Sequence, residues 1–425
     1  MSRRARRLGR GVALVGAGMS KFGAFADKTS RDLFVDAFNA MTKTVDKGVD
    51  TEDIEALYVG NYSSDLFEGQ GHIAPIMADW VGLVPKPATR VEDACASSGV
   101  AIREGILAIA SGLYDTVLVG GTEKMTNLPT EQVTDTLASA SDAVYEGACG
   151  FTFPGLYAAM ATAYMAKYGA SVEHFMKVGI KNHNNGALNP KAQFNRSIKD
   201  LMNARIEKAK QKGEPVPYWR DELEFLKDPR ANPVVAWPMR LFDCSPITDG
   251  AACILLVAED LAGDFSDNPI YIVGTGQGSD HALNERKDLT SILASRTAAK
   301  QAYEMAGVKP EDIQIAEVHD CFTIAELMAI EDLGFFKPGE AFVATERGLT
   351  ARDGAKPINT SGGLKSKGHP VGASGVGQVV EIWHQMRGEA GPRQVPGKDI
   401  RLALTHNVGA TGGTCVVHIY QRRSL

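Results

Sequence analysis

The chain has 425 residues, of which 44% are hydrophobic and 23% charged, and its formal net charge is −6. This composition is typical of a globular protein with two or more domains, and the acidic balance gives no general attraction to nucleic acid or acidic membranes. No apolar run approaches the roughly 18 residues of a membrane span. The cysteines show no CxxC spacing, so we expect free thiols in a cytoplasmic protein: Cys95, Cys149, Cys244, Cys253, Cys321 and Cys415.

The first ten residues (MSRRARRLGR) are basic and lack the apolar core of a secretory signal. We interpret them as a disordered arm or the edge of the first strand. Residues 11–18 (GVALVGAG) predict a buried strand ending in a glycine turn. Their spacing resembles part of a dinucleotide-binding fingerprint, but no helix starts after them, and that interpretation is discarded. The pattern then predicts a helix over 33–45, a strand over 56–59, an extended segment over 88–93, a helix over 97–111 and a strand over 116–119.

The same order of elements returns in the second half of the chain. Residues 270–276 repeat the first strand, and residues 402–405 repeat the strand over 116–119. A Ser-Gly-Val sequence opens a helix at Ser98 and again at Ser374. Repetition in this order indicates a duplication, and each half should build a mixed sheet with helices on its faces.

Residues 122–240 have no counterpart in the second half. They contain helical, polar and charged stretches, and they are too long for a loop, so we predict an inserted α-rich domain. The predicted division is an N-terminal half formed by residues 1–121 and 241–265, the insert over 122–240, and a C-terminal half over 266–425. The charges of the insert alone do not indicate a binding role, because a solvated face is the commoner explanation for them.

A glycine-rich stretch over 359–377 carries His369 on a tight loop just before a predicted helix. Cys95 precedes its own helix in the mirrored place of the first half. If the halves pack about a pseudo-twofold axis, Cys95 and His369 face each other at two helix N-termini. The helix end and the histidine would both favour a thiolate, whereas Glu92 and Asp93 would oppose it if they point inward. The alternative is that both residues merely pack.

Two further polar motifs follow predicted strands. His319-Asp320-Cys321-Phe322 comes after the strand over 313–318; for Cys321 the alternative is burial beneath the next helix. The second motif is the glycine-rich loop over 405–413, which can aim backbone N–H groups at an oxygen that becomes negative. Zinc is an alternative use of the cysteines and histidines, but they lack local ligand spacing, so we expect no metal.

Four motifs together resemble the active-site motifs of the thiolase superfamily, in order and in spacing. They are Cys95 in Asp-Ala-Cys-Ala-Ser-Ser-Gly, the motif His319–Phe322, Gly368-His-Pro-Val-Gly-Ala-Ser-Gly375, and His406-Asn-Val-Gly409. The resemblance covers nearly the whole chain and implies a duplicated, layered αβαβα fold with an inserted loop domain. It is closest to the sterol-carrier-protein type and related archaeal and bacterial thiolases, because the final loop lacks the usual cysteine.

The resemblance also implies an activity, the cleavage of 3-ketoacyl-CoA by CoA or the condensation of acetyl-CoA. In this family pattern Cys95 carries the acyl group, His369 deprotonates it, and Cys321 is the second acid and base. His319 assists in the thioester oxygen site. Asn407 and Gly409, with the backbone of Cys95, belong to the second oxyanion hole. Coenzyme A is expected as a substrate along the insert, with no bound cofactor, and Cys415 is assigned to the core.

For partners, the resemblance implies a homodimer or a dimer of dimers. Some relatives work with a small zinc-ribbon/OB-fold protein, and the resemblance keeps such a partner open here. Two rival functions remain. One is another carbon–carbon bond-forming or bond-breaking enzyme of this fold, a condensing enzyme or an aldolase-like lyase. Cys95 argues against the lyase, whose relatives lack the nucleophilic cysteine, and Cys321 argues against a decarboxylating condensing enzyme, which generally has a histidine or asparagine there. The other is a non-catalytic scaffold subunit.

Overall fold

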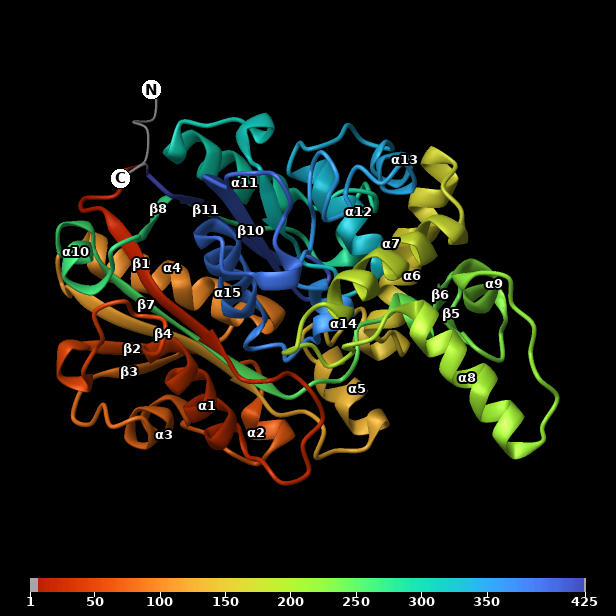
Figure 1. Ribbon diagram of the computed structural model, residues 1–425, viewed down its shortest axis with the longest axis horizontal. Helices are drawn as coiled ribbons and strands as arrows, with labels where there is room; N and C mark the ends of the chain where they lie inside the picture. The colour runs from red at the N-terminus through yellow and green to blue at the C-terminus, as the bar shows by residue number, and fades with distance from the viewer. Residues whose placement is uncertain (1–6, 424–425) are drawn as a thin grey trace.

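The computed structural model describes residues 7–423, so most of the predicted N-terminal arm lies outside the described residues. Its centre is a nine-stranded sheet with the order β3-β2-β4-β7-β1-β8-β11-β10-β9 (Figure 1). The strands are β1 (Val12–Met19), β2 (Ala56–Gly60), β3 (Ala88–Val91), β4 (Thr116–Glu123), β7 (Gly250–Ala258), β8 (Ile270–Ser279), β9 (Ile315–Glu317), β10 (Leu402–Gly409) and β11 (Thr414–Gln421). The strand β7 was not predicted.

The sheet consists of two mirrored halves. They meet where β1 pairs antiparallel with β8 over only three residue pairs. Outward from this joint, the first half runs β1, β7, β4, β2, β3, and the second runs β8, β11, β10, β9. In the place of β3, the second half has a single parallel bridge between Ala316 and Ile358. The predicted duplication is therefore confirmed by the strand order.

Helices cover and separate the two halves. Their bounds are α1 (Ser30–Thr42), α2 (Ser64–Phe67), α3 (Ile73–Trp80), α4 (Ser97–Ala110), α10 (Ala262–Phe265), α11 (Leu293–Ala306), α12 (Thr323–Asp332), α13 (Ala341–Glu346), α14 (Gly363–Lys367) and α15 (Ser374–Arg387). Both long helices predicted from the Ser-Gly-Val repeat, α4 and α15, are present. Among the helices of residues 7–423, none is long and apolar enough to cross a membrane.

Three hydrophobic cores order these elements into five layers. One core packs α1 and α3 on the outer face of the first half, through residues such as Phe34 and Met77. A second packs α4 and α15 between the halves, through Ile102 and Trp383. A third lies on the outer face of the second half, where α11 and α12 pack. Figure 1 shows the same succession, and the predicted αβαβα fold is confirmed.

The two central helices approach each other through glycine. A Cβ atom on Gly375 would lie 2.4 Å from the backbone nitrogen of Gly99, closer than atoms can approach. These two glycines are the central residues of the repeated Ser-Gly-Val sequence. Glycine is required here because the helix backbones meet at their first turns. The same contact brings the two loops that precede α4 and α15 together.

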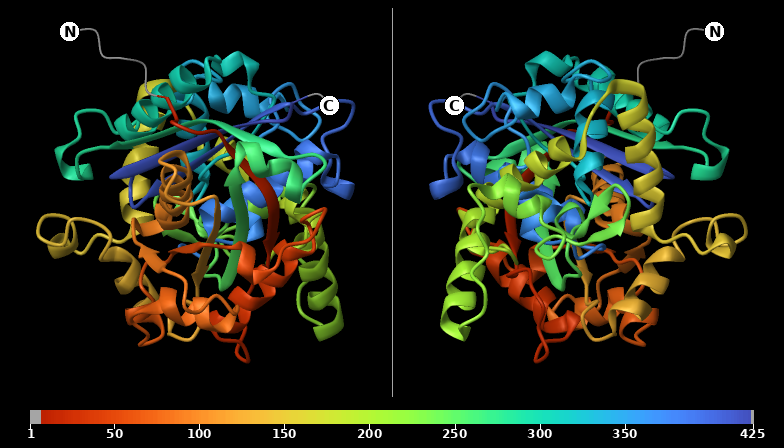
Figure 2. Two further views of the ribbon diagram at one scale, coloured as in Figure 1. Left: turned by 90° about the vertical axis from the view of Figure 1, so that its left-hand side faces the viewer. Right: turned by 90° about the vertical axis from the view of Figure 1, so that its right-hand side faces the viewer.

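The insert lies at one end of the molecule, on the right of Figure 1 and toward the viewer in the right-hand view of Figure 2. It is α-rich, as predicted, and adds a short hairpin that the sequence did not predict. Its elements are α5 (Thr130–Ala138), α6 (Phe153–Tyr168), α7 (Val172–Ala187), α8 (Ile198–Lys212), α9 (Glu222–Lys227), β5 (Val234–Ala236) and β6 (Met239–Arg240). The exact domain boundaries remain a prediction.

Candidate active site

Cys95 lies in a 3₁₀ turn, Ala94–Ala96, directly before α4. Ala94 has a φ of +49°, a left-handed conformation that is strained for any residue with a Cβ. The turn leaves Cys95 half-buried, with its side chain at the wall of a pocket. The strained residue therefore sits immediately before the candidate nucleophile.

The structure brings Cys95 together with two histidines. The sulfur of Cys95 and one ring nitrogen each of His319 and His369 all lie within 4.8 Å of one another. The two imidazole rings meet edge to face with centroids 5.1 Å apart. The predicted meeting of Cys95 and His369 is thus present in the geometry, and His319 completes the group.

The hydrogen bonds around His369 fix which of its nitrogens carries the proton. Its Nδ1 lies 2.6 Å from the Ser374 hydroxyl, which donates its own proton to the carbonyl of Pro370 over 2.9 Å. The hydroxyl therefore accepts from an Nδ1–H group. The Nε2 atom is buried and makes no hydrogen bond within residues 7–423. It carries the free lone pair that a general base needs.

Burial keeps these groups neutral. It lowers the pKa of His369 to about 3, with a further lowering from the charge of Lys367, and it puts the pKa of His319 well below its ordinary value. Burial also raises the pKa of the Cys95 thiol to about 12, although the backbone N–H of Ala410 works in the opposite direction. Desolvation is the largest cause of the shift at Cys95, and the charges of Glu123 and Glu92 act in the same direction.

Cys321 lines the same pocket as Cys95 and His369. It is 6% exposed and packs in the core beside α12. Cys321 is therefore buried beneath the next helix, as one interpretation expected, and it also faces the pocket, as the other expected. Burial and then the nearby Cys95 raise the pKa of its thiol, and a hydrogen bond with the Tyr157 hydroxyl lowers it. Tyr157 comes from helix α6 of the insert and carried no signal in the sequence.

Cys415 lies elsewhere. It is fully buried on β11 within the third core, and its sulfur contacts the carbonyl of Val416. Burial raises the pKa of its thiol well above the ordinary value. Its position is that of a packing residue, as expected.

The loop predicted over 405–413 is wrong in its first part, because strand β10 continues to Gly409 and only residues 410–413 form a turn. In the strand, the side-chain nitrogen of Asn407 lies 3.1 Å from the backbone carbonyl of Cys95 and 3.1 Å from Nδ1 of His319. Gly409 packs against the carbonyl of Asp93, where a Cβ atom would come within 2.6 Å. The end of β10 therefore joins the Cys95 turn to the His319 motif.

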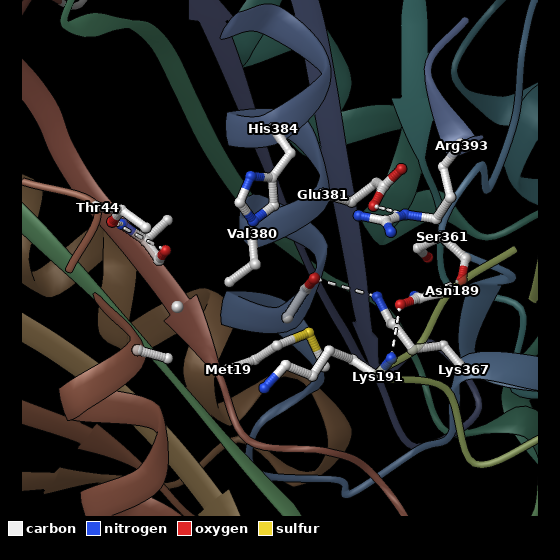
Figure 3. A pocket seen from close by; sticks show the side chains of 14 residues that line it. Met19, Thr44, Asn189, Lys191, Ser361, Lys367, Val380, Glu381, His384 and Arg393 are labelled. Atoms are coloured by element: carbon white, nitrogen blue, oxygen red, sulfur yellow. Dashed lines mark hydrogen bonds and ion pairs between the residues drawn. The ribbon is translucent and has the colours of Figure 1, made fainter. Parts of the chain in front are cut away.

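Buried charges support the loop that carries His369. Figure 3 shows Lys367 reaching toward α15, where its amine donates to the carbonyl of Gly377 over 3.1 Å. Its charge also faces the buried carboxylate of Glu317 at 3.7 Å. The cavity in Figure 3, of about 180 Å³, lies behind this loop and shares no residue with the pocket at Cys95. The sequence analysis did not identify Lys367, although it stands two residues before His369.

Asp320 ties the His319 motif to the same loop. It is fully buried, and its carboxylate accepts the backbone N–H of Leu364 at 2.6 Å and the side-chain amide of Asn182 at 2.7 Å. Burial and then the neighbouring Glu326 raise its pKa to about 7. Asn182 lies on α7, so this carboxylate also anchors the insert.

The pocket at Cys95 has a volume of about 540 Å³. The insert supplies much of its wall, including Met125, Leu137, Phe153 and Tyr157, and the loops supply Cys95, Cys321, His369 and Ala410. The wall is largely apolar, and the few reactive groups gather at one place. This is the usual construction of a small-molecule site.

The sequence was also compared with known proteins. It matches the family described as "Thiolase, N-terminal domain" over residues 12–260 and the "Thiolase C-terminal domain-like" family over residues 276–422. It is 44% identical to the acetyl-CoA acetyltransferase of Methanothermobacter thermautotrophicus, over 97% of this chain and 100% of that protein. It is 31% identical to sterol carrier protein 2 of Oryctolagus cuniculus, over 96% of this chain and 72% of that protein.

Solved structures share the fold. One chain of the "Ltp2-ChsH2(DUF35) aldolase" aligns with a TM-score of 0.78 and 24% identity, over 98% of this chain and 100% of that one. Human mitochondrial 3-ketoacyl-CoA thiolase in complex with CoA aligns with a TM-score of 0.70 and 20% identity, over 98% of this chain and 99% of that one. At these identities the likeness establishes the fold and leaves the chemistry to the residues.

Proposed function

The chain belongs to the thiolase family, and from this we propose how its residues divide the work of an acyltransferase that uses CoA thioesters. The reaction is cleavage of a 3-ketoacyl-CoA by CoA, or the reverse condensation of acetyl-CoA. The observation that carries the assignment is the meeting of one thiol and two neutral imidazoles within 4.8 Å, with Cys95 and His369 at the wall of a largely apolar pocket.

In the first half-reaction, Cys95 attacks the 3-keto carbon and passes its proton to Nε2 of His369. The C2–C3 bond breaks, and acetyl-CoA leaves as a carbanion that takes a proton from Cys321. In the second half-reaction, Cys321 removes the proton of the incoming CoA thiol. The CoA sulfur attacks the thioester on Cys95, and His369 returns its proton to the Cys95 sulfur.

The pKa values in the free protein suit this order of events. A neutral thiol beside a neutral imidazole is the resting state, since burial raises the pKa of Cys95 and lowers that of His369. Proton transfer then accompanies formation of the sulfur–carbon bond, when negative charge moves from sulfur to the substrate oxygen. His319 stabilises the thioester oxygen, and the backbone N–H groups of Cys95 and Gly409 stabilise the tetrahedral oxyanion.

We assign CoA to the side of the pocket that the insert forms. The pantetheine arm would enter along α5, α6 and the β5–β6 hairpin, because residues of all three segments line the pocket. On the hairpin, Val235 and Trp237 are 48% and 61% exposed. An exposed apolar rim at a pocket mouth suits coverage by a second protein surface, so we propose that a partner subunit or a small zinc-ribbon/OB-fold protein packs here.

The test is CoA-dependent cleavage of acetoacetyl-CoA, measured beside a long-chain and a steroidal 3-ketoacyl-CoA. We expect thioester products with at least one of them, and loss of the reaction in Cys95→Ser. Cleavage that consumes no CoA would instead indicate an aldolase-like lyase. Absence of both cleavage and acetyl-CoA condensation, in protein shown to be folded, would contradict the assignment.

A further inference from the structure

The amide group of Asn407 can adopt only one orientation. Its side-chain nitrogen faces the backbone carbonyl of Cys95 at 3.1 Å. A carbonyl oxygen accepts hydrogen bonds and cannot donate them, so the amide must present its NH₂ group there. With the amide reversed, two oxygens would face each other in a buried place.

The other side of the amide supports the same orientation. The Asn407 Oδ1 atom lies against Gly99 and Gly375, where added Cβ atoms would come within 2.6 and 2.5 Å of it. These glycines belong to the first turns of α4 and α15, so the oxygen faces the positive ends of two helices. This oxygen is buried and makes no hydrogen bond within residues 7–423. The two glycines of the repeat thus leave space for an amide oxygen, and the first turns of α4 and α15 provide a positive electrostatic potential there.

The orientation determines the proton position on His319. The same NH₂ group that faces Cys95 lies 3.1 Å from Nδ1 of His319. Nδ1 must therefore accept, and a neutral imidazole then carries its proton on Nε2. The Nε2 atom is buried and has no partner within the described chain. It is available as an N–H donor inside the site.

We propose that Asn407 is a positioning residue that fixes His319 in its Nε2–H tautomer. His319 then donates to a substrate oxygen, and Nε2 of His369 is left as the only imidazole lone pair beside Cys95. The roles of His319 as donor and His369 as base rest on the proposed function, whereas the tautomer of His319 does not. Without the Asn407 amide, both histidines could act as bases and neither would be a dedicated donor.

The tautomer also predicts how this group should bind a metal. One sulfur and two imidazoles within 4.8 Å are ligand types that zinc prefers, and small movements would bring them to the spacing, on the order of 3.5 Å, of a tetrahedral site. An Nε2–H group, however, has no lone pair for a metal. Wild-type protein therefore offers two ligands, Cys95 and His369, and a change at Asn407 should add the third.

The first test is nitrogen NMR of histidine-labelled protein, with the His319 signals identified by their loss in His319→Asn. In wild type we expect protonated Nε2 and bare Nδ1. In Asn407→Asp the carboxylate accepts a hydrogen bond from an Nδ1–H group, so the pattern should invert. In the isosteric Asn407→Leu neither tautomer is fixed, and a mixture should appear. An unchanged single tautomer in Asn407→Leu would overturn the proposal, and this variant avoids placing a charge beside the Cys95 carbonyl.

The second test is Co²⁺ binding, followed by the thiolate-to-cobalt charge-transfer absorption. Binding displaces the Cys95 thiol proton to solvent. We expect Asn407→Asp to bind one Co²⁺ about 10–100-fold more tightly than wild type, with the band absent in the double variant that also carries Cys95→Ser. Equal binding by wild type and Asn407→Asp would contradict the proposal. Neither test needs thiolase activity, so an inactive wild type with the expected tautomer would disprove only the proposed function.

Discussion

The sulfur of Cys95 and a ring nitrogen of His369 lie within 4.8 Å of each other, although the two residues come from opposite halves of a duplicated chain. Each stands on the loop before a central helix, and the helices meet at Gly99 and Gly375. The proposed nucleophile and its proposed base are therefore held together by the same contact that joins the two halves.

Cys95 is expected to carry the acyl group. Incubation with acyl-CoA in the absence of free CoA should add one acyl mass to the peptide that contains Cys95. Cys244 also lines the pocket, so Cys244→Ser serves as the matched control and should still be acylated. A stable adduct on another cysteine, with Cys95 unmodified, would refute the assignment.

His369→Ala should slow acylation of Cys95 by about 10²-fold or more, because the thiol has a raised pKa and depends on a base. Rapid-quench measurement of acyl-enzyme formation gives this rate directly. His384→Ala is the control, since His384 lies on α15, the helix that follows the His369 loop, but lines the separate cavity of Figure 3. Near-normal acylation in folded His369→Ala would leave His369 as a structural residue only.

Cys321→Ala should retain acylation of Cys95 and lose exchange of the acetyl-CoA α-protons with solvent, and thiolysis with it. Deuterium incorporation from heavy water, read by mass spectrometry, measures the exchange. Cys415→Ala should leave both steps almost unchanged, because Cys415 is in the core and away from the pocket. Exchange that survives without Cys321 and disappears without Cys415 would mean that the second catalytic thiol is Cys415 on strand β11.

Gly375→Ala should destabilise the protein by about 1–3 kcal/mol and slow acylation as well. The added methyl would lie 2.4 Å from the backbone of Gly99 and would separate the two central helices. Denaturant unfolding gives the stability change. Gly263→Ala is the control, because a Cβ atom there meets nothing within 4 Å. Equal stability of the two variants would show that the helix contact adapts freely.

His183 should make the protein less stable in mild acid. Burial lowers its pKa to about 3, so below pH 6.5 the unfolded chain binds a proton that the folded chain does not. Stability is therefore lost as the pH falls from 6.5 toward 3. The free energy of unfolding, relative to that of His183→Phe, should drop by about 1.4 kcal/mol between pH 7.5 and 5.5. Subtracting the free energy of unfolding of His183→Phe cancels the titration of other groups, such as the buried Asp320. A difference between the two proteins that does not change with pH would contradict the prediction.

Much of this protein follows from its sequence alone. The repeated Ser-Gly-Val helix starts and the glycine-rich loops at strand ends are local patterns, and they predicted the duplicated fold and the four loops of the candidate site. The same motifs led to the proposal that Cys95, His319, Cys321 and His369 form the reactive set. The strand β7 was not predicted, although it is fully buried and apolar in the same way as β1.

The tertiary structure decided how these residues are protonated and held. The pKa of Cys95 is raised by burial, because desolvation depends on everything packed around the thiol. Tyr157 beside Cys321 comes from a contact between distant segments. The tautomer of His319 depends on one amide of Asn407 wedged between two helix ends. Such properties arise from the sum of three-dimensional neighbours, and no local stretch of sequence contains them.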